Sequence, residues 1–413
     1  MPERLRHILW VGAIATVLVS ISAPPADAHG GKQLAVRTAG PYSIEIYALL
    51  IRAGNRYAID YTSYLRDRRT GFPADDARVT VAVRRPDNSV AGPYRANAFA
   101  NSYEVLLPVR SAQAWRKLRL LIGIRGPLGG ATLEYAPPAL ASEWLIQPSV
   151  LALAALAALL FAQAFVRLRR RGRADHAGWG RAVLFLVGLC LAVLPLISPL
   201  DAVGDIYLLS GHMLEHVLIG DAAPALLLVA VRGPLLFFLL PPLILRRVAH
   251  SSRLRRALAF ATRPRTALVL WAIVFGFWHI PRFYDYVLTH PLAHDLEHAT
   301  FFVAGLLVWT QLIDPARTGR LSPGRRLAAG VLLLWMGTVL SYVLLFSFRP
   351  LYPAYADQAE RVFGLSPLRD QQAAGLVMMV EQLLSLGIFT ALLIGSRLRP
   401  ARRTRLAVGL VGR

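Results

Sequence analysis

The chain has 413 residues, of which 55% are apolar, and it carries a formal net charge of +22. A strong basic excess can indicate nucleic-acid binding, but here the arginines stand in blocks between long apolar runs, as in the cytoplasmic loops of membrane proteins. The composition therefore favours a multi-pass protein of the lipid bilayer and argues against a nucleic-acid partner. The single cysteine, Cys190, excludes an intrachain disulfide and a thiolate cluster, and we expect it to be a small buried hydrophobe.

Residues 1–28 have the pattern of a secretory signal peptide. A charged start precedes the apolar residues 8–21, and Ala26-Asp27-Ala28 is a cleavage site with small outer residues. Cleavage there would leave His29 as an amino terminus able to chelate copper through its amine and its ring. The next histidine is His176, so the outer domain cannot complete such a site alone. A loose polar terminus is the better interpretation.

Residues 29–140 change to short runs of β-type sequence separated by turn signals such as Ala53-Gly54-Asn55. The predicted strands are Tyr42–Ile51, Arg56–Tyr64, Ala77–Val83, Tyr103–Val109 and Leu118–Ile124. Several such strands in about a hundred residues predict a small β-sandwich-like extracytoplasmic domain. This domain contains no nucleophile motif, so we expect it to serve in docking or packing.

Residues 144–396 contain seven apolar segments long enough to cross a bilayer, which predicts an all-α polytopic domain of about seven transmembrane helices. These segments are residues 145–166, 182–200, 207–231, 267–284, 291–313, 327–348 and 370–395. The run 234–245 is too short to span and contains Pro241-Pro242, so we place it along the inner surface.

The arginine blocks between these segments fall on one side of the predicted bundle. By the positive-inside rule, that side is cytoplasmic. The topology that follows is a bacterial plasma (inner) membrane protein with its amino terminus outside. Its carboxyl terminus, the basic tail of residues 397–413, is then cytoplasmic.

Two of the predicted spans carry the same short pattern, H-x-L-E-H, near their outer ends. It occurs as His212-Met213-Leu214-Glu215-His216 and as His294-Asp295-Leu296-Glu297-His298. On a helix, positions i and i+4 lie on one face with i+3 beside them, so each motif presents two imidazoles and a carboxylate on one stripe. Ionisable groups among lipid tails are costly unless they face a partner, an ion or a watery cavity. We therefore expect both stripes to serve one metal site.

Further polar residues fall at the same predicted depth. His279 lies near the outer end of an outward-running span, and Asp370 opens the last span. Glu381 follows eleven residues later, about 16 Å deeper at the helical rise. The predicted metal site comprises His212, His216, His279, His294, His298, Glu215, Glu297 and Asp370. Imidazole suits copper, zinc, iron and nickel, and the glutamates either bind the metal or orient the histidine rings.

Six stretches around these residues resemble a known family in combination. They are Ser198-Pro199-Leu200-Asp201, Ser210 to His216, Trp278-His279-Ile280-Pro281 with Tyr284, His294 to His298 followed by Trp309, Leu351-Tyr352-Pro353 with Tyr355, and Asp370 to Gly375. Between residues 184 and 395 the chain resembles the caa3-type cytochrome c oxidase assembly factor family of bacterial multi-span membrane proteins. The β-rich domain lies outside this region.

The resemblance implies an assembly factor rather than an enzyme. It implies that the protein handles copper for the buried centre of the oxidase's catalytic subunit, through the five histidines at positions 212, 216, 279, 294 and 298. The partners it implies are the cytochrome c oxidase subunits, with a periplasmic copper donor as a further candidate.

Three alternatives stay open. H-x-x-E-H is also the inverzincin pattern, in which two histidines hold zinc and the glutamate acts as a base. A di-iron oxygenase of the histidine-box kind would need more histidines, on the cytoplasmic face. A haem protein is the strongest rival, because facing histidines at matched depth are what bis-imidazole ligation of haem requires. A metal assay with an absorption spectrum separates these alternatives.

Overall fold

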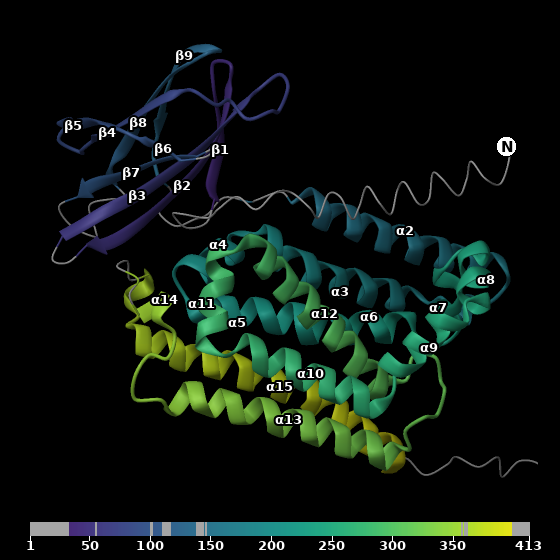
Figure 1. Cartoon of the computed structure of the whole chain (residues 1–413). Helices are drawn as coiled ribbons and strands as arrows, with labels where there is room; N and C mark the ends of the chain where they lie inside the picture. The colour runs from purple at the N-terminus through teal and green to yellow at the C-terminus, as the bar shows by residue number, and fades with distance from the viewer. Residues whose placement is uncertain are drawn as a thin grey trace, which may run out of the picture.

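The structure is a computed structural model of the chain, shown in Figure 1. It describes residues 33–53, 56–99, 102–109, 117–137, 144, 147–356, 358 and 362–398. The predicted signal peptide, His29 and nearly all of the basic tail lie outside these residues. The described chain forms an antiparallel β domain followed by a bundle of long helices, which confirms the predicted fold class.

The β domain consists, within the described residues, of nine strands in two antiparallel sheets. Their bounds are β1 Gln33–Ala39, β2 Tyr42–Ala53, β3 Arg56–Asp67, β4 Arg78–Arg84, β5 Val90–Arg95, β6 Asn97–Phe99, β7 Ser102–Val109, β8 Arg119–Gly126 and β9 Gly129–Tyr135. The strand orders are β1-β2-β3-β7-β6 and β5-β4-β8-β9. Buried residues of both sheets, such as Ile44, Val81 and Ile122, share one apolar core. All five predicted strands are present.

Six helical segments of the described chain are long and apolar enough to cross a membrane. They are α2 Pro148–Arg170, α3 Trp179–Ile197, the continuous segment Leu209–Val231, α12 Pro291–Ile313, α13 Pro323–Phe346 and α15 Pro367–Leu398. The helices α9 Ser252–Ala261 and α10 Pro264–Trp278 meet at 68° and add a seventh if the pair is one span. The prediction of about seven spans is therefore confirmed.

Proline residues break the helices at two places, of which only the run 234–245 was predicted to be broken. The sequence predicts one span over residues 267–284, but α10 ends at Trp278 and α11 Pro281–Thr289 begins separately. Pro281 lacks an N–H and disfavours helical geometry at the residue before it, so that prediction was wrong in its outer third. The run 234–245 divides into α7 Pro234–Leu239 and α8 Pro242–His250.

Cys190 differs from its prediction. It lies on an exposed face of α3 rather than in the core of the bundle. An apolar run that crosses a membrane has one face toward lipid, and a small thiol is tolerated there as readily as in the interior.

The segment Leu209–Val231 contains a local change of helix type. It consists of α5 Leu209–Val217, the π-helical turn η3 Leu218–Ala222 and α6 Ala223–Val231. Of the most apolar stretch of each span, 44% is buried in this segment and 56% in α12. The corresponding share is 17% in α2 and in α3. The two helices that carry the repeated motif are thus at the centre of the bundle.

The β domain lies against one end of the bundle, over α4 Pro199–Ile206 (Figure 1). Ala202 and Ile206 of α4, together with Val362, belong to the same apolar core as the two sheets. The core of the β domain therefore continues directly into the helix that precedes the first motif.

Gly220 and Gly305 bring the two motif helices into close contact. A Cβ atom on Gly305 would overlap the carbonyl oxygen of Gly220, and a Cβ on Gly220 would lie 3.3 Å from the Cβ of Phe301. Small residues at such crossings let helix backbones approach closely within a membrane.

Replacing Gly305 by alanine should therefore destabilise the bundle. We expect Gly305→Ala to lower the free energy of unfolding by about 1–3 kcal/mol, the range for overpacking a tight core, because the backbone of η3 must move away. The midpoint of thermal unfolding in detergent measures this. Gly276→Ala on α10 is the matched control, since its added Cβ meets nothing within 4 Å. An equal loss in both variants would contradict the prediction.

Candidate metal centre

The first motif presents its three ionisable side chains from α5. His212 and Glu215 are fully buried and His216 is nearly so. The Nε2 atoms of His212 and His216 lie 2.8 Å apart, so their rings point into the same small volume. The helical spacing of four residues produces this pairing, as the sequence predicts.

The second motif faces the first from α12. The Glu297 carboxylate lies 3.9 Å from His212 Nε2 and 3.7 Å from His216 Nε2. In the opposite direction, Glu215 Oε1 lies 4.0 Å from His298 Nε2. The glutamate of each motif thus approaches the histidines of the other motif. The two stripes form one cluster.

The short helix α4 supplies a carboxylate that the sequence analysis did not include. Asp205 Oδ1 lies 3.4 Å from His212 Nδ1 and 3.4 Å from His294 Nε2. This reach depends on Gly204, where an added Cβ would come within 2.8 Å of the backbone nitrogen of His212. Asp201 is four residues earlier and also buried, so the i,i+4 rule applied to α4 would have found the pair.

Three groups of these residues have ligand atoms close enough to share an ion. In each group the ligand atoms lie within 4.8 Å of one another. The groups are His212 with His216 and His298, Asp205 with His212 and His294, and Asp201 with Asp205 and Glu215. We call the residues Asp201, Asp205, His212, Glu215, His216, His294, Glu297 and His298 the histidine–carboxylate cluster.

Tyr355, on α14 Pro353–Ala356, determines how His212 presents its nitrogens. Its hydroxyl donates to the carbonyl oxygen of Gly204 at 2.8 Å and lies 3.2 Å from His212 Nδ1. Because the hydroxyl proton is already used, Nδ1 of His212 must be the donor in the second bond. The lone pair of His212 is therefore on Nε2, which faces the cluster.

Residues 159–399, more than half of the chain, match the sequence profile of the cytochrome c oxidase caa3 assembly factor family. The chain belongs to this family. Comparisons with curated proteins and with solved structures gave no match. The matched residues include the whole histidine–carboxylate cluster and exclude the β domain. The family features of this assembly factor are therefore those of its helical bundle.

Two predicted ligands of the assembly factor lie at the edge of the cluster. The His279 ring centroid lies 6.3 Å from that of His216, and its Nδ1 bonds the carbonyl oxygen of Phe275 at 2.7 Å. Asp370, on α15, accepts hydrogen bonds from Leu209 N at 2.7 Å, Ser210 N at 3.2 Å and Ser210 Oγ at 2.6 Å. These bonds cap the amino-terminal end of α5, where the preceding Leu208 offers no side-chain cap. Asp370 thus holds the first motif helix in place.

The donor set of the cluster fits a metal ion. Both carboxylate oxygens of Glu297 are buried without a hydrogen-bond partner within the described residues. Buried polar atoms are almost always satisfied, and an unsatisfied carboxylate in an apolar bundle is especially costly. An ion bound by imidazole and carboxylate would satisfy these atoms, and such donors suit copper or zinc.

Replacing Asp370 by asparagine tests its capping role in this assembly factor. The amide turns one of its two acceptors into a donor, so we expect the free energy of unfolding to fall by about 1–2 kcal/mol, as for loss of a helix cap. Thermal unfolding measures this loss, and we expect the metal stoichiometry to stay unchanged. Glu297→Gln is the contrasting variant and should lower metal affinity. Metal loss in Asp370→Asn at unchanged stability would make Asp370 a ligand instead.

Proposed function

We propose that this assembly factor binds copper in the histidine–carboxylate cluster and delivers it to cytochrome c oxidase. The observation that carries the proposal is the convergence of imidazole nitrogens from both motifs. His212, His216 and His298 place their ligand atoms within 4.8 Å of one another, although they belong to two helices about eighty residues apart in sequence. The family's client, the caa3-type oxidase, supplies the reason for choosing copper among the metals that imidazole binds.

The size of the cavity beside the cluster favours an ion over haem. The cavity beside His216 and His279 has a volume of about 50 Å³. Pockets for ligands of drug or cofactor size have volumes of roughly 300–1,000 Å³, so a porphyrin would require the helices to separate. Buried imidazoles from two helices would otherwise be equally suited to haem iron.

The burial of the motif glutamates argues against hydrolysis. In an inverzincin, the glutamate activates a water molecule that attacks a substrate. Glu215 and Glu297 are fully buried and each lies against histidines of the opposite motif. A carboxylate in this position neutralises a bound cation and orients imidazoles, which is the chemistry of a carrier.

The proposed setting is the bacterial plasma membrane, with the β domain and the cluster toward the outside. The arginines of the loops after α2, around α9 and after α12 supply the positive charge of the cytoplasmic side. The cluster then lies near the outer surface, where a periplasmic copper donor and the oxidase subunits are both accessible.

Labelling of introduced cysteines tests this orientation. In a Cys190→Ala background, Phe348→Cys should react with a membrane-impermeant maleimide in intact cells, because Phe348 is 99% exposed in the loop after α13. Ser252→Cys, at the exposed start of α9, should react only after the cells are opened. The opposite pattern would place the cluster on the cytoplasmic side.

Loss of either motif should abolish most copper binding. We expect His212→Ala and His298→Ala each to remove most bound divalent copper, measured by equilibrium dialysis and electron paramagnetic resonance, because one site takes ligands from both helices. His290→Ala is the matched control, since His290 directly precedes α12, is exposed and stacks on Tyr286. Each variant retaining half of the copper would indicate two independent sites.

The same residues test delivery in cells. A His216→Ala, His298→Ala double variant should behave like a deletion, with oxidase subunits made and their copper centre empty. Added copper in the medium should partly restore the oxidase. A fully metallated oxidase at low copper in the double variant would refute copper delivery.

A further inference from the structure

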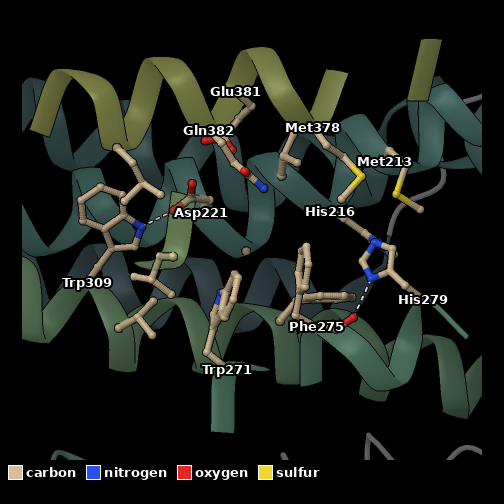
Figure 2. Close-up of a pocket in the computed structure, with 16 residues that line it drawn as sticks. Met213, His216, Asp221, Trp271, Phe275, His279, Trp309, Met378, Glu381 and Gln382 are labelled. Carbon is tan, nitrogen blue, oxygen red and sulfur yellow. Dashed lines mark hydrogen bonds between the residues drawn. The ribbon is translucent and has the colours of Figure 1, made fainter. Parts of the chain in front are cut away.

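Below the cluster, a cavity of about 50 Å³ extends into the bundle between α5, α10, α12 and α15. At one end of it lie the thioethers of Met213 and Met378 and the rings of His216 and His279, which Figure 2 shows gathered together. We call these four residues the thioether pocket. Both methionines are buried, with exposed fractions of 0% and 1%.

His279 is held with its free nitrogen toward this cavity. Its Nδ1 lies 2.7 Å from the carbonyl oxygen of Phe275, an atom that can only accept, so Nδ1 carries the proton. The lone pair is therefore on Nε2, which is buried and has no hydrogen-bond partner within the described residues. A histidine whose second nitrogen is fixed by a backbone carbonyl has the arrangement that metal-ligating histidines normally have.

His216 belongs to both the cluster and the pocket. Its Nε2 lies 2.8 Å from His212 Nε2, on the side of the cluster. Its ring also lines the cavity, and its Nδ1 has no hydrogen-bond partner among the described residues. The two nitrogens of one imidazole thus face two neighbouring volumes, and the tautomer decides which of them carries the lone pair.

The far end of the cavity is lined by carboxyl groups rather than by basic side chains. Asp221, in the π-helical turn η3, and Glu381, on α15, both line it (Figure 2). Asp221 accepts hydrogen bonds from Trp309 Nε1 and, at 2.8 Å, from Ser385 Oγ. The cavity contains no lysine or arginine among its lining residues, so no basic side chain there repels a cation.

We propose that the thioether pocket is a second metal site, which binds a soft monovalent cation such as Cu(I) through Met213, Met378, His216 and His279. The inference rests on the proposed copper function and specifies an oxidation state within it. Thioether sulfur is a soft ligand that selects Cu(I), whereas the carboxylates of the cluster suit a divalent ion. His216 then lies between the two sites, and its neutral ring can ligate a metal in one of them at a time.

Ordinary core packing does not explain the pocket. Methionine often fills irregular gaps in apolar cores, and the thioethers alone would fit that role. A core filler, however, does not require two buried imidazole nitrogens without hydrogen bonds at the same cavity. The other two methionines of the described chain, Met336 and Met379, do not line the cavity. They therefore serve as controls for the effect of replacing a methionine by leucine.

X-ray absorption of the purified full-length protein in detergent tests the inference. In a Cys190→Ala background, the Cu(I)-loaded protein should show copper–sulfur scattering. A Met213→Leu, Met378→Leu double variant should lose it, because leucine keeps the apolar volume but has no sulfur. We also expect Ag(I), a redox-inert probe, to bind about 10- to 100-fold more weakly to that variant. Removing a residue that only supports a metal ligand typically costs this much affinity, so removing two ligands should cost at least as much. A Met336→Leu, Met379→Leu variant should match the parent in both measurements.

The outcomes separate this inference from the proposed function. Copper–sulfur scattering that persists in the Met213→Leu, Met378→Leu variant, or that is absent from the parent while divalent copper still binds, refutes the pocket and leaves the cluster intact. Binding of neither Cu(II) nor Cu(I) by the parent refutes both. The single variants Met213→Leu and Met378→Leu control for loss of the fold, and each should keep the unfolding midpoint of the parent. Each should also retain one sulfur ligand to copper. Two sulfur ligands in either single variant would also refute the pocket.

Discussion

The contact between Gly220 and Gly305 determines the distance between the two helices that carry the histidines. No side chain larger than hydrogen fits at Gly305, so the α5–α6 segment and α12 approach as closely as backbones can. Only at that distance can Glu297 reach His212 and His216, and Glu215 reach His298. Helix crossings in membranes commonly depend on small residues, because apolar side chains gain little by leaving lipid. The cluster is thus a consequence of a backbone contact.

The second constraint is the cost of ionisable groups inside an apolar bundle. Nearly all of the charged and imidazole side chains of the inner bundle lie beside another such group. Glu297, His216 and His279 nevertheless retain buried atoms without hydrogen-bond partners within the described residues. Buried atoms of this kind require an explanation, and the metal ion of our proposals is a ligand that imidazole, carboxylate and thioether can share.

The β domain and α14 both contact the elements that hold the histidine–carboxylate cluster. The core of the β domain continues into α4, the helix that contributes Asp201 and Asp205. From the other side, Tyr355 bonds both the backbone of α4 and the ring of His212. A displacement of the β domain would therefore move a carboxylate of the cluster. This contact connects the β domain directly to the histidine–carboxylate cluster, although the domain lies outside the family's matched region.

The sequence by itself determined the membrane class, the number of spans, five of the strands and the helical stripes of the two motifs. These features depend on local periodicity, and the i,i+4 spacing of His212 and His216 is preserved in any helix. It missed β1, β5, β6 and β9. Of these, β5 contains Gly92-Pro93 and β9 begins with two glycines, so both runs have weak strand signals.

Only the tertiary structure decided which stripes meet. Three features depend on residues that are far apart in the chain. They are the capping of α5 by Asp370, the contact of Asp205 with His294, and the shared cavity of Met213 and Met378. Sequence spacing fixes the face of a helix on which a residue lies. It does not fix the rotation and distance of one helix relative to another, which follow from packing at contacts such as Gly220 and Gly305.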